Sequence, residues 1–265
     1  MSASDSNQKL TFARPEPPAA GLDGKLRYWW CWAAASAMLL LVGIPSLLFL
    51  WLIKRRRALY PIAHWGARTW LSACGATLRV SGLENLDPDR QYVFAANHRS
   101  YLDTAALFVA TGKLIGLVAK RELLKVPVLG QGMGFVNIIA VDRSNPERAL
   151  RSMDKARSVV ADGYSFGVFV EGTRAMPGEL LPFKKGAFHL ALQTQVPIIP
   201  VAIRNTDQMM PKKGGFSRPG EIHVTLLPPI STEGKTTDDV MELLLATRQA
   251  IYAELSSDPN ANGDR

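Results

Sequence analysis

An apolar stretch without a charged side chain, residues 28–53, constrains the fold of this chain more than any other feature. About 20 apolar residues suffice to cross the hydrocarbon core of a bilayer, so the stretch is long enough to span a membrane. Tryptophans lie near both of its ends, where interfacial aromatic residues are enriched. A basic run, residues 54–57, follows at once and predicts that the rest of the chain lies on the cytoplasmic side of an inner or plasma membrane.

The path of this stretch through the membrane stays open at the level of sequence. Gly43 and Pro45 interrupt its middle, which allows either a single crossing or a re-entrant hairpin in one leaflet. A cleaved signal peptide is a further alternative, which the length of the run and the extended polar leader disfavour. The next segment, residues 58–78, fits either an interfacial helix or an ordinary amphipathic helix packed on a domain. Its apolar stripe consists of Ile62, Trp65, Thr69, Trp70 and Ala73.

The bulk properties narrow the class of partner. The 265 residues suffice for one catalytic domain and an accessory segment. A net charge of +8 suits nucleic acid, an anionic membrane surface or an anionic substrate. No nucleic-acid-binding signature and no zinc-ligand spacing is present in the sequence, so we expect membrane lipids and an anionic substrate, without nucleic acid or a bound metal. Cys31 and Cys74 do not suggest a disulfide framework, which fits a reducing compartment.

Alternating strand-like and helix-like segments predict an α/β domain over residues 78–255. Strands are expected at 78–81, 92–96, 114–118, 138–141, 166–170, 198–203 and 222–227, and helices at 100–110, 146–161, 185–193 and 237–255. This order is typical of a mixed, largely parallel sheet flanked by helices, with the ligand site beyond the carboxyl ends of the strands. Residues 25–77 are predicted to be a membrane-anchoring helical segment, embedded or interfacial. Residues 1–24 and 256–265 are predicted to be a disordered leader and tail.

The first polar turn follows the strand at 92–96 and carries His98, with Asp103 after four intervening residues. Ser100 is a candidate helix N-cap with Asp103 three positions on, which places the carboxylate in the first helical turn. A carboxylate bonded to one ring nitrogen fixes the tautomer of a histidine and leaves the other nitrogen free to take a proton. The alternative is a surface histidine and a capping aspartate that never meet.

The second polar turn, Glu171-Gly172-Thr173-Arg174, also follows a predicted strand. Gly172 allows the backbone to approach a ligand closely. Arg174 offers a planar fork suited to phosphate or carboxylate. By itself the turn is equally compatible with a loop that carries a solvated arginine.

Together these blocks resemble the glycerolipid acyltransferase family, best known for the 1-acylglycerol-3-phosphate acyltransferases. The His-four-residues-Asp block of the family matches His98 and Asp103, and its Glu-Gly-Thr-Arg block matches residues 171–174. Residues 181–188 and 196–202 match two further blocks. Residues 138–143 match the remaining block more loosely, since Asn137 replaces a usual glycine and Ala140 a common aromatic residue. The resemblance spans residues 78–229, with all blocks in order.

The resemblance implies transfer of a fatty acyl group from an acyl thioester to the free hydroxyl of a lysophospholipid. The donor would be acyl-CoA or acyl-acyl carrier protein, no cofactor would be bound, and 1-acylglycerol-3-phosphate would become phosphatidic acid. His98 is then the general base, oriented by Asp103. Arg174 would hold the acceptor phosphate, with Glu171, Gly172 and Thr173 shaping its loop. Further phosphate-binding candidates are Lys120, Arg143, Lys184 and Lys185, although the three lysines are equally compatible with solvated side chains.

Three other functions remain open. The acceptor could be another lysophospholipid or a lyso-amino-acid lipid, because Arg174 recognises an anion without specifying it. A non-catalytic lipid-binding protein on the same scaffold would not need the His98–Asp103 pair. A serine lipase is suggested by Gly163-Tyr164-Ser165-Phe166-Gly167, which satisfies the G-x-S-x-G pattern of a nucleophile elbow. That elbow needs a strand before the serine and a helix after it, and here the predicted order is reversed.

Overall fold

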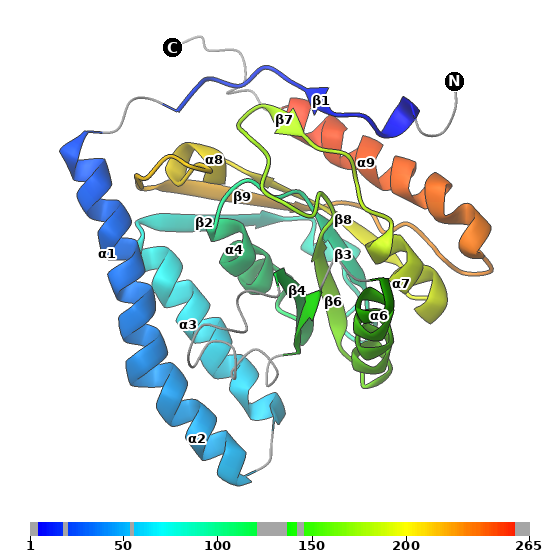
Figure 1. Cartoon of the computed structure of the whole chain (residues 1–265), viewed down its shortest axis with the longest axis horizontal. Coiled ribbons are helices and arrows are strands. Elements are labelled where there is room, and N and C mark those ends of the chain that lie inside the picture. Colours follow the sequence, from blue (N-terminus) through cyan, green and yellow to red (C-terminus); the bar gives the residue numbers. More distant parts are fainter. Residues whose placement is uncertain (1–4, 18–20, 54–55, 121–136, 142–145, 258–265) are drawn as a thin grey trace.

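The computed structural model describes residues 5–17, 21–53, 56–120, 137–141 and 146–257. Its centre is a seven-stranded sheet in the order β2-β9-β8-β3-β6-β4-β5 (Figure 1). The strands β8, β3, β6, β4 and β5 run parallel, while β9 is antiparallel to β8 and parallel to β2. The prediction of a mixed, largely parallel sheet is therefore confirmed. The strand bounds are β2 (Ala76–Ser81), β3 (Val93–Ala96), β4 (Ile115–Lys120), β5 (Ile138–Val141), β6 (Ser165–Phe169), β8 (Ile198–Arg204) and β9 (Gly220–Leu226).

Helices cover both faces of the sheet, as the predicted architecture requires. One face contacts α4 (Leu102–Thr111), and α3 (Leu59–Ala73) packs against α4 and β2. The other face contacts α6 (Pro146–Ala161), α7 (Gly186–Thr194) and α9 (Val240–Ser256). A short helix, α8 (Thr206–Met209), follows β8. The central strand β3 is buried along its whole length, which explains its uninterrupted apolar sequence.

The apolar stretch of the sequence forms one continuous helical rod. It consists of α1 (Leu22–Met38), a π-helical turn (Leu39–Gly43) and α2 (Ile44–Ile53), and it lies along one side of the molecule (Figure 1). The rod does not turn back at Gly43 and Pro45. The π turn instead accommodates the missing N–H donor of the proline, so the hairpin alternative within this stretch does not hold. Large apolar side chains stay exposed along the rod: Leu22, Leu26, Trp29, Trp30, Leu40, Leu41, Leu48, Phe49 and Leu52.

The helix after the rod, α3, packs on the α/β domain through α4 and β2 and also on α1 and α2. Tyr60 and Leu71 are buried against the domain. Trp65, from the stripe predicted for an interfacial helix, is exposed, whereas Trp70 of the same stripe donates its indole N–H to the Cys31 carbonyl in α1 at 2.9 Å. Since α3 contacts both the rod and the domain, it bridges the two.

The prediction of a disordered leader does not hold for residues 5–17, here called the N-terminal strap. Its strand β1 (Leu10–Thr11) pairs antiparallel with β7 (Glu179–Leu180), beside α9 (Figure 1). Arg14 forms a bidentate ion pair with Asp207 at 3.0 and 3.1 Å, and both side chains are buried. Composition indicated disorder because the contacts of the strap, polar and apolar, reach distant parts of the chain. The predicted tail lies outside the described residues from position 258 onward.

Candidate active site

The structure brings His98 and Asp103 together at the carboxyl end of β3. His98 Nδ1 lies 2.8 Å from Asp103 Oδ2. The same oxygen accepts the backbone N–H groups of Arg99 at 2.6 Å and Ser100 at 2.7 Å. Ser100 Oγ accepts the N–H of Leu102 at 3.2 Å. The N-cap residue of α4 is Tyr101, one position after the predicted Ser100, and the Ser100 N–H binds Asp103 in the first turn of the helix. The pair is therefore fixed by the local fold of a few residues.

This geometry prepares the histidine to act as a base. Asp103 is fully buried, and its carboxylate accepts a hydrogen bond from the Nδ1–H group, which leaves Nε2 as the acceptor nitrogen. The imidazole stacks on Phe169, with ring centroids 4.1 Å apart and an interplanar angle of 19°. Phe169 covers one face of the ring and Asp103 binds its Nδ1 edge. The His98 side chain is still 18% exposed, so a ligand can reach it.

Glu171 joins the two polar turns to each other. Its Oε1 accepts the backbone N–H of His98 at 2.7 Å, and its Oε2 accepts the N–H of Leu181 at 2.8 Å. The Ala175 N–H returns a bond to the His98 carbonyl at 2.8 Å. Burial raises the pKa of Glu171 to about 7, against the two N–H bonds and the nearby Arg99 charge, which lower it. The sequence assigned Glu171 to the loop of Arg174 alone, and the structure shows that it holds His98 as well.

Arg174 lies over an aromatic ring of the first turn. Its guanidinium carbon is 3.7 Å from the ring centroid of Tyr101, which is the geometry of a cation–π contact. Its Nη1 is buried and has no hydrogen-bond partner among the described residues. The Lys212 ammonium binds the Arg174 carbonyl and brings a second cation to this loop. A buried donor without an acceptor is costly, so the arrangement suits an anionic ligand that supplies one.

The other residues of the second turn shape its path. Gly172 has a φ of 72°, in the left-handed region that favours glycine, so the loop reverses there. Thr173 is exposed.

The remaining phosphate-binding candidates are less fully described. Lys120 is the last residue of β4, and its side chain is outside what the structure describes; Arg143 lies outside the described residues. Lys184 and Lys185 are exposed. The N–H of Lys184 donates to the Val170 carbonyl at 2.7 Å, which places this block directly beside the second turn.

Ser165 has a structural role. It is buried, and its Oγ accepts the backbone N–H of Tyr92 at 3.1 Å. It is also the first residue of β6, after the helix α6, which is the reverse of a nucleophile elbow. The serine-lipase alternative therefore lacks the geometry it needs.

Sequence reasoning missed three residues that support the site. Arg99 is buried beside the strap, with its guanidinium carbon 4.7 Å from the Phe12 ring and Nη1 3.6 Å from Asp207. Tyr101 lies inside the first motif. Its aromatic side chain was the only feature of the sequence that could have indicated its contact with Arg174. Lys212 follows Pro211, which forms an isolated bridge with Ser100, and nothing in the sequence points to that proximity.

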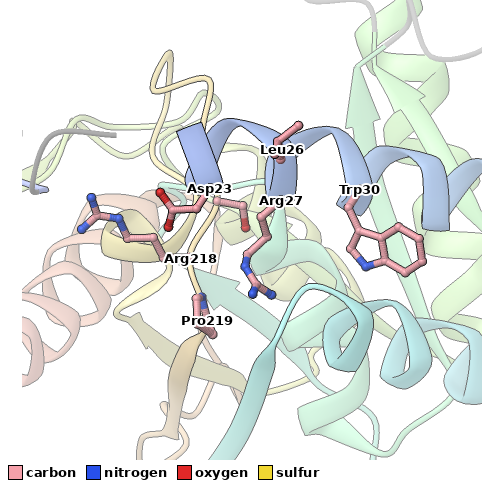
Figure 2. Close-up of a pocket in the computed structure, with 7 residues that line it drawn as sticks. Asp23, Leu26, Arg27, Trp30, Arg218 and Pro219 are labelled. Atoms are coloured by element: carbon pink, nitrogen blue, oxygen red, sulfur yellow. The ribbon is translucent and has the colours of Figure 1, made fainter. Parts of the chain in front are cut away.

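A separate pocket of about 630 Å³ lies beside the first turns of α1 (Figure 2). It is lined by Asp23, Leu26, Arg27, Trp30, Ser217, Arg218 and Pro219, none of which was predicted for catalysis or binding. Figure 2 shows the guanidinium groups of Arg27 and Arg218 pointing in different directions, so they do not converge on one anion. Within the described ranges, no cluster of three or more His, Cys, Asp or Glu side chains could hold a metal ion.

Comparisons with known proteins identify the family of this chain. A family model described as "Acyltransferase" matches residues 77–204. The 1-acyl-sn-glycerol-3-phosphate acyltransferase alpha of Mus musculus is 38% identical over 195 residues, covering 72% of this chain and 68% of the relative. The 1-acyl-sn-glycerol-3-phosphate acyltransferase of Limnanthes douglasii is 38% identical over 203 residues, covering 74% and 70%.

The fold also matches a solved structure. The crystal structure of the 1-acyl-sn-glycerophosphate (LPA) acyltransferase PlsC from Thermotoga maritima superposes with a TM-score of 0.74 at 24% identity, over 86% of this chain and 95% of that one. At this identity the match supports the fold alone. The sequence relatives carry the assignment further: this chain belongs to the acyltransferase family that its motifs predict, and it is an O-acyltransferase.

Proposed function

We propose that this chain is a membrane-bound enzyme that transfers a fatty acyl group from a thioester to the free hydroxyl of a lysophospholipid. The acceptor we propose is 1-acylglycerol-3-phosphate, with phosphatidic acid as product. The observation that carries the proposal is the 2.8 Å contact between His98 Nδ1 and a fully buried Asp103. Lipid binding alone needs no such oriented base.

In the proposed mechanism, His98 Nε2 takes the proton of the acceptor hydroxyl while its oxygen attacks the thioester carbonyl. Asp103 stabilises the imidazolium that results. The tetrahedral intermediate then collapses, the C–S bond breaks, and the leaving thiolate takes the proton back from the imidazolium. The products are an ester and a free thiol. The backbone N–H groups around Lys185 and Gly186, at the start of α7, are our proposal for the donors that stabilise the oxyanion.

The acceptor site we propose is centred on Arg174. Its guanidinium would bind the phosphate as a planar fork, and Lys212 would add positive charge beside it. Lys120, Arg143, Lys184 and Lys185 stay candidates for further contacts with either substrate. The acyl donor is acyl-CoA or acyl-acyl carrier protein, and the mechanism requires no bound cofactor.

Membrane attachment is proposed through residues 25–77, with residues 78–255 as the acyltransferase domain on the cytoplasmic side. The supporting observation is a 28-residue helical span, Leu22–Phe49, with an apolar window of mean hydropathy 2.0 that is not buried in the protein. A helix of that length reaches about 42 Å, more than the hydrocarbon core requires. Exposed apolar surface of this extent is typical of a lipid-contacting helix.

The first test is thiol release by the full chain purified in detergent. Acyl-CoA and acyl-acyl carrier protein would each be supplied with a panel of lysolipids. We expect release that depends on 1-acylglycerol-3-phosphate and falls by about 10²- to 10⁴-fold in His98→Ala, the range that a positioned base contributes. Ser165→Ala is the matched control and should keep most of the activity.

Each outcome has a clear meaning. Release with a different lysolipid, still dependent on His98, would keep the mechanism and replace the acceptor. Strong loss in a folded Ser165→Ala variant would overturn direct transfer by His98. Absence of release with every acceptor and both donors, in folded protein, would favour the lipid-binding alternative.

A further inference from the structure

The ring of Tyr101 connects the acceptor site to the apolar rod. On one side it carries the Arg174 guanidinium, 3.7 Å from the ring centroid. On the other it meets Trp32 of α1, with centroids 5.1 Å apart and an interplanar angle of 80°. Aromatic pairs favour this edge-to-face geometry, and a guanidinium favours the face of a ring. The three side chains therefore form one contact chain, here called the Trp32–Tyr101–Arg174 stack.

Tyr101 depends on these two neighbours for its position. It is 41% exposed although it lies between the fully buried residues Ser100 and Leu102. A ring that projects from the surface has little core packing to restrict its rotamer. Contacts with Trp32 and Arg174 restrict it instead, so a displacement of α1 would release the ring.

Arg174 in turn relies on Tyr101 to orient its fork. The backbone of its loop is fixed separately, because Lys212 binds its carbonyl and the Ala175 N–H binds the His98 carbonyl. The guanidinium lies over the ring, and Nη1 is left without a hydrogen-bond acceptor among the described residues. Stacking over a ring directs the N–H groups of a guanidinium sideways, where they can meet two oxygens of one anion.

We propose that Tyr101 is a positioning residue for the acceptor phosphate and that Trp32 sets the position of Tyr101. The position of α1 against the domain then controls the affinity for the acceptor. The inference rests on the proposed function, because it presumes a phosphate-bearing lipid at Arg174. The proposal separates phosphate binding at Arg174 from proton transfer at His98. The His98–Asp103 pair does not depend on this stack, since Asp103 is held by backbone groups of its own turn.

The stack also gives a physical reason for placing the acceptor site beside a lipid-contacting helix. The exposed apolar side chains of the rod mark the surface that would lie in lipid. Trp32 belongs to the same rod, so a movement of the rod against the domain would shift the Tyr101 ring that contacts Arg174. Binding of the acceptor would then be sensitive to the lipid or detergent around the rod, while proton transfer at His98 would not.

The test is steady-state kinetics on the full chain in one detergent, with KM measured separately for 1-acylglycerol-3-phosphate and for the thioester. Tyr101→Leu removes the aromatic face and keeps apolar volume, whereas Tyr101→Phe keeps the face. We expect Tyr101→Leu to raise the acceptor KM by about 2- to 30-fold, the range of a cation–π contact, with the thioester KM unchanged. Tyr101→Phe should restore a nearly normal acceptor KM.

Trp32→Ala should raise the acceptor KM in the same direction and by a smaller factor. Trp65→Ala is its matched control, since Trp65 is 54% exposed on the neighbouring helix α3. We expect Trp65→Ala to leave both Michaelis constants unchanged. In an Arg174→Met background, Tyr101→Leu should have no further effect on the acceptor KM, because the group that it positions is gone.

Three results would overturn the inference. One is a Tyr101→Leu variant that raises both Michaelis constants equally, as general loosening of the fold would. Another is a Tyr101→Phe variant as defective as Tyr101→Leu. The third is a Trp32→Ala variant that behaves like Trp65→Ala. Failure of the proposed function is distinguishable, because the unmodified protein would then release no thiol with this acceptor.

Discussion

The two polar turns of the site are built in different ways. In the first, Asp103 Oδ2 accepts from the His98 ring and from the backbone of Arg99 and Ser100, all within five residues. In the second, Glu171 holds the backbone of His98, 73 residues away, and Arg174 rests on Tyr101. The segment that follows Arg174 contains β7, in which Leu180 pairs with Leu10 of the strap.

The difference separates catalysis from recognition in this site. The base and its orienter lie on one strand, one turn and one helix N-terminus, so the hydrogen bond between them is local. Glu171 and Phe169 add contacts to His98 from the second turn and the strand before it. The anion-binding loop depends on the strap, on α1 and on the turn of His98. Perturbing distant parts of the chain should therefore affect the second turn before the first.

Among variants that test this difference between the two turns, Asp103→Asn is expected to have the largest effect on turnover. The amide is nearly isosteric, and its oxygen can still accept the N–H groups of Arg99 and Ser100. The charge that stabilises the imidazolium is lost, so we expect kcat to fall by about 10²- to 10⁴-fold with little change in either Michaelis constant. Measurement of kcat, both KM values and the Tm checks this. Near-normal turnover would show that Asp103 only caps the helix.

The next effect concerns Glu171, which links the turns. Burial raises the pKa of Glu171 to about 7 in the folded protein, whereas an unfolded glutamate titrates near about 4.3. Between these values the folded protein holds the proton more tightly, so this group's stabilising contribution is complete below about pH 4 and is lost as the pH rises through 7. The loss is on the order of 3 kcal/mol of unfolding free energy.

Denaturant unfolding gives the free energy of unfolding of the unmodified protein and of Glu171→Gln from pH 4 to 8. The difference between the two free energies at each pH measures the contribution of Glu171. The unmodified protein should lose stability relative to Glu171→Gln as the pH rises. Parallel curves for the two proteins would contradict a buried, late-ionising Glu171. A difference of the opposite sign would show that the two N–H donors and Arg99 outweigh burial.

The smallest effect tests whether the strap supports the second turn. Arg14→Gln removes one partner of the buried pair with Asp207, which keeps its contact with Arg99. We expect a loss of about 2 kcal/mol, below the usual range for breaking a buried pair because one cation remains. Chemical unfolding and limited proteolysis of the strap provide the measurement.

Lys9→Gln is the control for the strap. Lys9 pairs with Glu179 at 2.8 Å but is half exposed, so its loss should cost less than about 1 kcal/mol. Equal losses in the two variants would indicate that the strap is held by its backbone pairing and not by the buried ion pair.

Much of the fold was predictable because its elements have local signatures. The strand Ile138–Val141 and the helix Pro146–Ala161 begin and end where their apolar patterns predict. The helix predicted to begin at Ser100 begins at Leu102 with Tyr101 as its N-cap, and the Ser100 N–H binds Asp103 in its first turn. Periodicity, capping and turn residues act over a few positions, so they are legible in sequence.

The amino-acid sequence by itself determined the α/β alternation, the apolar stretch and the spacing that allows His98 and Asp103 to meet, because each arises from residues that are close together in the chain. Only the tertiary structure decided that the strap is ordered, that Glu171 holds His98, and that Arg174 rests on a ring which Trp32 supports. Those contacts join residues at least 69 positions apart in the chain, such as Trp32 with Tyr101 and Arg14 with Asp207. Their energy comes from burial and hydrogen bonding between surfaces that the folded sheet brings together, and such pairings leave no periodic pattern along the chain.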